Sequence, residues 1–286
     1  MILVTGATGT IGRALIRRLD DAVAFVRDPA KGAELGCRHV VGDFDDPASL
    51  AAAMPGVSRV FLNAGGAVPV AGEQPMIRQQ RAVIDAAVAA GVRHVVKLSV
   101  WHARPEGRLA EGAHGVIEEY LKGAGVGWSV LQPNGFMQNF LTGAAVFTEG
   151  GHLLGAYRDS RVSYVDTEDI AACAAELLTG DPRAGRTFVL TGPEGLTHAE
   201  IGAKLSKVAG REIRYLDLPA SDFAARLGAL GVPGGFAEDV AGLFAEVTTG
   251  RLAPVTDSVA ELTGRPPRSF DAFLQDNAAV IRESWA

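Results

Sequence analysis

The sequence predicts an α/β fold: a doubly wound parallel sheet with a smaller, mostly helical C-terminal lobe. Two observations support this class. The chain opens with an apolar, strand-like run that meets three glycines, Gly6, Gly9 and Gly12, directly before a helical pattern. Strand-like and helix-like segments then alternate through the first half of the chain. Such alternation is typical of a parallel sheet covered by helices on both faces.

The glycine-rich loop indicates a Rossmann-type dinucleotide site. Gly6 permits a tight strand-to-helix turn, Gly9 lets a pyrophosphate approach bare backbone, and Gly12 lets the helix pack close to the strand. The N-terminus of the helix presents free N–H groups to the phosphates. The loop residues expected to contact the cofactor are Gly6, Thr8, Gly9, Thr10, Ile11 and Gly12. The alternative is a structural strand–turn–helix with incidental glycines, and the strand and helix flanks argue against it.

The other elements follow from short apolar runs that end at turn residues. The expected strands cover residues 2–4, 23–26, 38–41, 59–62, 94–99 and 128–131, and helices are expected near 11–19, 47–54, 75–90 and 115–122. Later segments predict strands at 163–165, 187–190 and 213–216, and helices at 168–178, after the Thr197–Glu200 capping box, and at 221–230, 236–248 and 270–281.

The domain boundary is expected after the sixth strand of the first half. Residues 1–133 form an NAD(P)-binding domain, whose sheet is completed by strands near 163–165 and 187–190. Residues 134–286 form a smaller substrate-binding lobe.

Composition narrows the class of protein further. The chain is 48% hydrophobic and 21% charged, which is typical of a globular protein, and its net charge of −6 argues against a nucleic-acid partner. Cys37 and Cys173 are the two cysteines, and no histidine or cysteine spacing suits a metal. The first strand starts at Met1, and no apolar run reaches the roughly 20 residues that span a bilayer. We expect a cytoplasmic protein with no membrane partner and no metal, and the sequence is compatible with an oligomer.

Ligands of this fold bind beyond the carboxyl ends of the strands. The residues just past the predicted strands are Arg27, Asp43, Asn63, Ser99 and Pro133. NAD enzymes usually place an acidic residue about 20 residues after the glycines, to bind the ribose 2′-hydroxyl. Here that strand ends in Arg27, and Lys31 follows one helical turn later. Cations suit a 2′-phosphate, so we expect NADPH rather than NADH, although Asp28 could offset their field.

Seven segments resemble the NmrA-like branch of atypical short-chain dehydrogenases/reductases, and especially the type 2 NAD(P)H:quinone oxidoreductases. They are residues 5–12, 26–31, 42–46, 97–99, 114–122, 133–139 and 166–171. The similarity covers nearly the whole chain. It implies a Rossmann-type sheet, a small C-terminal substrate lobe and a cofactor cleft between them.

The resemblance also implies roles for individual residues. Arg27 and Lys31 are similar to the 2′-phosphate contacts. The adenine and the central part of the cofactor would be lined by Asp43, Phe44, Asn63 and Ala64. Lys97 and His114 would approach the nicotinamide half, and the strand-end residue Pro133 is included in the same site. The segment that would cover the nicotinamide is Phe136, Met137, Gln138 and Asn139, with core packing as the alternative for the first two.

The usual catalytic pair of short-chain dehydrogenases, Tyr-x-x-x-Lys, is absent. Tyr120, Tyr157, Tyr164 and Tyr215 are followed four positions later by Ala124, Arg161, Glu168 and Pro219. His114 instead matches the position at which the related isoflavone reductase-like proteins carry a catalytic lysine. Glu118, one helical turn on, is expected to face His114 and raise its pKa. The alternative is a solvent-facing pair.

The catalytic candidates are therefore His114, Glu118, Ser99 and Lys97. His114 would donate a proton or polarise a carbonyl. Ser99 would hold a substrate oxygen, or simply cap the following segment. Because a quinone is already electrophilic, its reduction needs little acid catalysis from the protein. We expect an NADPH-dependent oxidoreductase acting on a quinone-like or aromatic acceptor. The alternatives are a non-catalytic NADP(H) sensor that acts through a protein partner, and a biosynthetic tailoring reductase.

Overall fold

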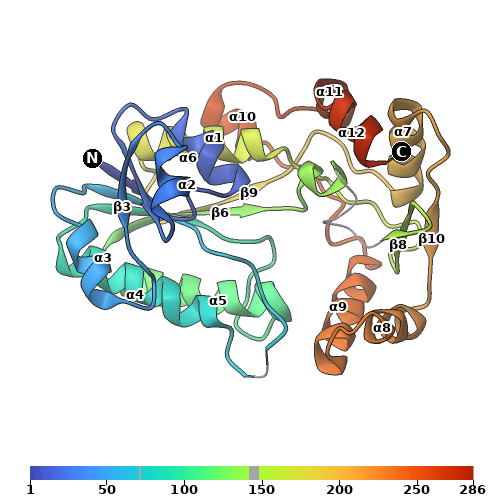
Figure 1. Cartoon of the computed structure of the whole chain (residues 1–286), viewed down its shortest axis with the longest axis horizontal. Coiled ribbons are helices and arrows are strands. Elements are labelled where there is room, and N and C mark those ends of the chain that lie inside the picture. The colour runs from blue at the N-terminus through green and yellow to red at the C-terminus, as the bar shows by residue number, and fades with distance from the viewer. Residues whose placement is uncertain (71, 142–147, 286) are drawn as a thin grey trace. The chain divides into compact units, whose positions relative to one another are not determined.

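The computed structural model describes residues 1–70, 72–141 and 148–285 (Figure 1). The chain forms two compact units. Unit 1 contains residues 1–133, 167–190 and 258–264, and unit 2 contains residues 134–166, 191–257 and 265–286. Each unit is assembled from separate stretches of sequence, because the chain passes from one to the other several times.

Unit 1 is built on a seven-stranded parallel sheet. In sheet order its strands are β3 (Arg38–Val41), β2 (Ala22–Val26), β1 (Ile2–Val4), β4 (Arg59–Leu62), β5 (His94–Leu98), β6 (Gly127–Pro133) and β9 (Arg186–Leu190). The strand order reverses beside β1, which is the topological switch point of a Rossmann sheet. The predicted fold class is thus confirmed, including the return of β9 to the sheet.

Helices cover both faces of this sheet (Figure 1). One face carries α3 (Pro47–Ala53), α4 (Pro75–Ala89) and α5 (Leu109–Gly123), and the other carries α1 (Thr10–Ile16), α6 (Thr167–Thr179) and α10 (Ser258–Thr263). The short helix α2 (Pro29–Ala33) links β2 to β3. None of the helices in the described ranges is both long and apolar enough to cross a membrane.

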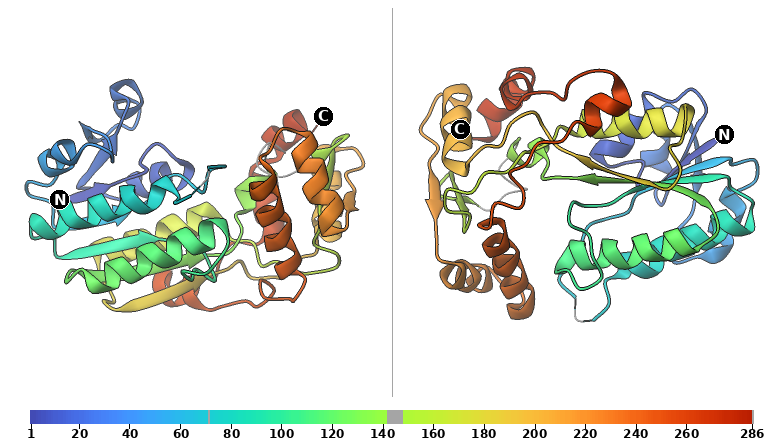
Figure 2. Two further views of the ribbon diagram at one scale, coloured as in Figure 1. Left: turned by 90° about the horizontal axis from the view of Figure 1, so that it is seen from below. Right: turned by 180° about the vertical axis from the view of Figure 1, so that it is seen from behind.

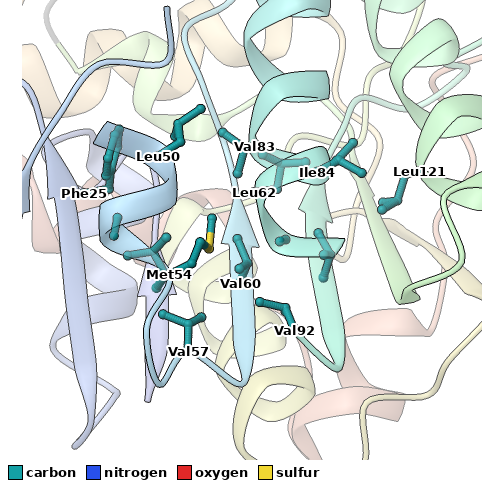
Figure 3. Packing of buried hydrophobic residues seen from close by; sticks show 14 of the residues in the cluster. Phe25, Leu50, Met54, Val57, Val60, Leu62, Val83, Ile84, Val92 and Leu121 are labelled. Atoms are coloured by element: carbon teal, nitrogen blue, oxygen red, sulfur yellow. The ribbon is translucent and has the colours of Figure 1, made fainter. Parts of the chain in front are cut away.

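The core beneath α3, α4 and α5 is apolar, as Figure 3 shows. Its labelled side chains are Phe25, Leu50, Met54, Val57, Val60, Leu62, Val83, Ile84, Val92 and Leu121. Val95 of β5 belongs to the same cluster. Side chains of a strand alternate between faces, so Lys97, two residues on, lies on the same face as Val95. An amine therefore ends an otherwise apolar stripe of β5.

Unit 2 combines a small sheet with several helices. Its strands are β7 (Thr148–Glu149), β8 (His152–Gly155) and β10 (Tyr215–Asp217), and its helices are η1 (Met137–Phe140), α7 (His198–Ala209), α8 (Ala220–Ala229), α9 (Gly234–Val247), α11 (Phe270–Asp276) and α12 (Ala278–Ser284). Helices α8 and α9 lie side by side (Figure 2). The predicted capping box of α7 is confirmed, since Thr197 and Glu200 each accept the other's backbone N–H.

The expected strand at residues 163–165 does not join the large sheet. Val165 forms a single bridge with Phe136, and Val162 forms one with Leu196. The N–H of Ser163 donates to the carbonyl of Leu252, so loop partners satisfy this backbone without a sheet edge. The single helix expected at 270–281 is likewise divided at Asn277.

Candidate active site

The first turn of the chain has the geometry that its glycines predict. Gly6 has a φ of +62°, which favours glycine, and its carbonyl accepts the N–H of Gly9 at 3.1 Å. A Cβ at Gly12 would lie 2.3 Å from the carbonyl oxygen of Gly6. Helix α1 therefore packs against the turn as only glycine allows. Gly9, its N-cap, provides no side-chain cap, so the first turn keeps unsatisfied N–H groups.

A cavity of about 470 Å³ opens beside this turn within unit 1. It lies at the carboxyl ends of the strands, where the sequence predicts that the ligand binds. The predicted residues that line it are Gly6, Thr8, Gly9, Arg27, Asp43, Phe44, Asn63 and Ala64. The cavity is thus lined by segments that follow β1, β2, β3 and β4.

Two stacked aromatic rings, Phe25 and Phe44, line part of this cavity. Phe44 stacks on Phe25, with ring centroids 5.5 Å apart and planes at 14°. Beside them the carboxylate of Asp43 accepts the backbone N–H of Asp45 at 2.9 Å, which shapes the loop. This arrangement suits the planar base of a nucleotide.

Thr5 fixes the position of Asn63, which lines the cavity. Its hydroxyl donates to the carbonyl of Asn63 and accepts the N–H of the same residue, both at 2.8 Å. The Asn63 amide lies over Gly6, because a Cβ on Gly6 would be 2.7 Å from Asn63 Nδ2. The end of β4 is thereby fixed against the glycine turn.

Arg27 provides a cation at the cavity wall. Arg27 and Lys31 are exposed, and no hydrogen bond or ion pair of the described residues engages either side chain. Lys31 does not line the cavity itself. Asp28, which could have neutralised them, instead caps α2 by accepting the N–H of Ala30 at 2.9 Å. A dianion near Arg27 therefore meets an uncompensated guanidinium.

Two arginines that directly follow α1 are paired elsewhere in unit 1. Arg17 and Arg18 both pair with Glu168 of α6, at 2.8 and 2.6 Å. Arg17 and Arg18 therefore stabilise the fold, whereas Arg27 is available to bind a ligand.

A second group of polar side chains, all buried except the half-buried Gln132, lies between β5, β6 and α5. We call Lys97, Ser99, His114, Glu118 and Gln132 the β5 polar cluster. Lys97 is fully buried, and its amine lies 2.8 Å from His114 Nδ1 and 3.0 Å from the carbonyl of Leu98. The cluster brings together all four predicted catalytic residues.

Glu118 was predicted to face His114, but it contacts other residues. Its carboxylate accepts from the Ser99 hydroxyl at 2.5 Å and from the Gln132 amide at 2.9 Å. It also pairs with Lys122 at 3.1 Å. The expected contact with His114 is not formed among the described residues, because His114 turns toward Lys97. The only hydroxyl hydrogen of Ser99 is used on Glu118, so Ser99 cannot also donate to a substrate.

The protonation of His114 follows from this geometry. While Lys97 is an ammonium ion it must donate to Nδ1, and the ring hydrogen is then assigned to Nε2. Burial and the charge of Lys97 hold the pKa of His114 well below 6.5. The prediction that Glu118 raises this pKa is therefore wrong. The solvent-facing alternative is also wrong, because His114 is 8% exposed and Glu118 is 3% exposed. Burial lowers the pKa of Lys97 to about 7, against the opposing effect of Glu118.

No tyrosine replaces the missing catalytic pair. The pKa of Tyr120 is raised by its hydrogen bond to Asp85. Burial raises the pKa of the other three, Tyr157, Tyr164 and Tyr215. All four tyrosines are thus weaker acids than usual.

The predicted covering segment lies in unit 2. Met137 is 1% exposed and packs in the hydrophobic core of this unit. The amide of Gln138 donates to the buried carboxylate of Asp166 at 2.6 Å. Phe136 forms the N-cap of η1, and its carbonyl accepts the N–H of Asn139 at 3.1 Å. In unit 1, the carbonyl of Pro133 accepts the N–H of Trp101.

We next compared the chain with known protein families and structures. The family model described as NmrA-like family matches residues 1–274. The chain belongs to the NmrA-like family.

Three similar proteins match this chain over almost its whole length. The chain is 36% identical to the NAD(P)H azoreductase of Xenophilus azovorans, over 98% of this chain and 99% of the relative. It is also 36% identical to the (4-alkanoyl-5-oxo-2,5-dihydrofuran-3-yl)methyl phosphate reductase of Streptomyces griseus, over 98% and 99% of the two chains. The NADPH-dependent quinone oxidoreductase of Escherichia coli, solved with NADPH, superposes with a TM-score of 0.83 at 30% identity, covering 96% of this chain and 99% of that one.

Sequence reasoning missed several residues of this NmrA-like site. Phe25 forms the aromatic floor, and Met76 and Gln79 of α4 line the cavity. Gln132 completes the partners of Glu118. The sequence did contain a signal for Met76, because it lies in the first turn of α4, the helix that follows β4, and ligands bind beyond the carboxyl ends of the strands.

Proposed function

We propose that this protein transfers hydride from NADPH to a quinone or a similar conjugated small molecule. The observation that carries the acceptor class is the make-up of the β5 polar cluster, in which the amine of Lys97 lies 2.8 Å from Nδ1 of His114. Burial holds the pKa of His114 well below 6.5 and lowers that of Lys97 to about 7, whereas the pKa of each of the four tyrosines is raised. Such a set suits an acceptor that is already electrophilic.

The protein is an NADPH-dependent oxidoreductase. This broader statement rests on its relatives, which include an NAD(P)H azoreductase and a quinone oxidoreductase solved with NADPH. Their acceptors carry conjugated N=N or C=O bonds, and the furanone phosphate reductase acts on a further conjugated compound. Conjugation, rather than one carbonyl type, is the shared feature.

The residues of the cavity fit NADPH. The backbone from Gly6 to Thr10 would hold the pyrophosphate, because its N–H groups lack side-chain caps. Arg27, with Lys31 nearby, would bind the 2′-phosphate. Phe44 and Asp43 would flank the adenine. When bound, the cofactor supplies hydride from its reduced nicotinamide.

His114 would act on the acceptor through Nε2. Its N–H can donate to the oxygen or nitrogen on which negative charge develops, a form of electrostatic stabilisation. A neutral imidazole holds its proton until that charge appears. Glu118, fixed by Ser99 and Gln132, stays an acceptor and does not compete for the substrate.

Steady-state reduction assays test the proposal. NADPH consumption is measured with a quinone, an azo dye and, as control, an unconjugated ketone, beside calorimetric titrations of NADPH and NADH. We expect turnover with the conjugated acceptors only. Tight NADPH binding without consumption on any acceptor would contradict the proposal and favour a sensor of the NADP(H) state.

A further inference from the structure

The β5 polar cluster contains an amine that no substrate can touch. Lys97 is fully buried, and its register neighbours in the sheet, Leu62 on β4 and Val130 on β6, are apolar. Burying an ionisable amine is unfavourable unless its partners compensate. A role for Lys97 must therefore operate through a neighbour.

His114 is that neighbour. The amine of Lys97 lies 2.8 Å from Nδ1, while Nε2 lies on the opposite side of the imidazole ring. His114 retains a small exposed fraction, 8%, whereas Lys97 has none. Of this contacting pair, only His114 therefore has any exposed surface.

We propose that Lys97 is the source of the proton that completes reduction of the acceptor, and that His114 passes this proton on. This inference rests on the proposed function. It names the proton donor for the step that follows hydride transfer, in which the reduced acceptor is protonated. His114 is then a catalytic residue, because it contacts the acceptor. Lys97 does not contact the acceptor and acts only through His114.

The proton transfers balance. Hydride addition leaves the acceptor as an anion. The Nε2–H bond of His114 breaks as its proton binds this anion, while an N–H bond of the Lys97 ammonium breaks and its proton binds Nδ1. Lys97 is left as a neutral amine. After the product leaves, a proton from solvent binds Nε2, and the Nδ1 proton returns to Lys97. The net reaction consumes one hydride and one proton.

The surroundings of Lys97 favour this role. The titratable groups facing it are His114 and Glu118, both on α5. Among the described residues, Glu118 is the one anion that acts on Lys97, and Ser99, Gln132 and Lys122 stabilise its charge. On the buried face of α4 the polar residue is Gln80, which is uncharged. The anion supports the ammonium form, and burial opposes it, so the pKa of Lys97 is set at about 7.

The direct test is Lys97→Met with the pH profile of kcat. In the wild type, kcat should fall as pH rises through about 7, because the ammonium loses its proton. We expect Lys97→Met to lower kcat by about 100-fold and to abolish this fall, as typical for loss of an acid. NADPH affinity should stay within about twofold. Wild-type kcat with an unchanged pH profile in this variant would overturn the proposal.

Two further variants keep the test decisive if Lys97→Met does not fold. Glu118→Gln removes the anion, so the pH at which kcat falls should decrease. Lys122→Met is the matched control, since it removes a lysine from the same carboxylate without touching His114. In that control, kcat should decrease at the same pH as in the wild type or at a higher pH. An unmoved or raised midpoint in Glu118→Gln refutes the relay.

The outcomes separate the two proposals. Turnover by the wild type, together with wild-type behaviour of Lys97→Met, leaves the reductase intact and removes the relay. Tight NADPH binding by the wild type without turnover on any conjugated acceptor counts against both.

Discussion

The strand β5 has a buried polar side chain near each end, His94 and Lys97. The hydrogen-bond partners of these two side chains differ. At its N-terminal end, His94 Nε2 lies 2.7 Å from the hydroxyl of Ser129, which itself donates to the carbonyl of Pro182. Because Ser129 uses its hydrogen there, His94 must be the donor. At the other end, His114 contacts Lys97, an amine that titrates near neutral pH.

This difference separates a histidine with a structural role, His94, from His114, which we propose to be catalytic. The chain of contacts from His94 ends on a backbone carbonyl, which cannot change its protonation. Burial and the nearby charge of Arg59 lower the pKa of His94 to about 4, so it stays neutral. The contacts of His114 end on a group that can gain and lose a proton. Ligands bind at the carboxyl ends of parallel strands, so only the second arrangement is placed for chemistry.

The largest effect is expected at the glycine turn, which belongs to the carboxyl end of the sheet. Gly12→Val would force side-chain atoms against the carbonyl of Gly6. We expect NADPH affinity, measured by calorimetry, to fall by at least about 1,000-fold. Gly123→Ala is the control, because a Cβ there meets nothing within 4 Å. Unchanged affinity in Gly12→Val would mean that the turn does not bind the pyrophosphate.

The comparison of the two histidines is sharpened by substituting each with glutamine. His114→Gln should lower kcat by about 100- to 1,000-fold with little change in NADPH affinity, because the donor at the acceptor is lost. His94→Gln should leave kcat within about twofold and lower the free energy of unfolding by about 1–3 kcal/mol. Kinetics and urea denaturation measure both effects. Equal kinetic losses would remove the distinction.

A smaller effect is expected at the cavity wall. Arg27→Ala should weaken NADPH by about 10- to 100-fold while NADH binding is unchanged, since only NADPH carries the 2′-phosphate. Arg17→Ala is a suitable control because Arg17 already pairs with Glu168. Titration with both cofactors measures the change in preference. Equal weakening of both cofactors by Arg27→Ala would assign this arginine to a different part of the nucleotide.

The smallest effect concerns stability against acid. The folded pKa of His94, about 4, lies below its ordinary value of 6.5. Between these values the unfolded chain binds a proton that the folded protein rejects, so stability falls as pH decreases from 6.5 to about 4. His94→Asn should flatten this dependence in urea titrations at several pH values. The same slope in both proteins would show that other groups cause it.

The parts of the site that sequence predicted are those whose requirements are local. The glycines of the first turn, the cation after β2 and the polar residues after the strands each follow from a few neighbouring positions. The strand–helix alternation predicted the sheet because side-chain periodicity reflects burial. The short run at 163–165 misled this reasoning, since its apolar residues are buried without pairing in the large sheet.

Other features could not be predicted because they depend on contacts between distant segments. Lys97 and His114 are 17 positions apart and meet only after α5 packs on β5. The i, i+4 spacing suggested that His114 would face Glu118, yet competing partners from β5 and β6 decide both orientations. The stacking of Phe25 on Phe44 likewise joins the ends of two strands.

The sequence by itself determined the class of fold, the glycine turn after β1 and the cation after β2, since these depend on backbone freedom, periodicity and residue type. Only the tertiary structure decided which groups are protonated. A pKa depends on burial and on the charges that folding brings within a few ångströms, and neither quantity is encoded in neighbouring residues.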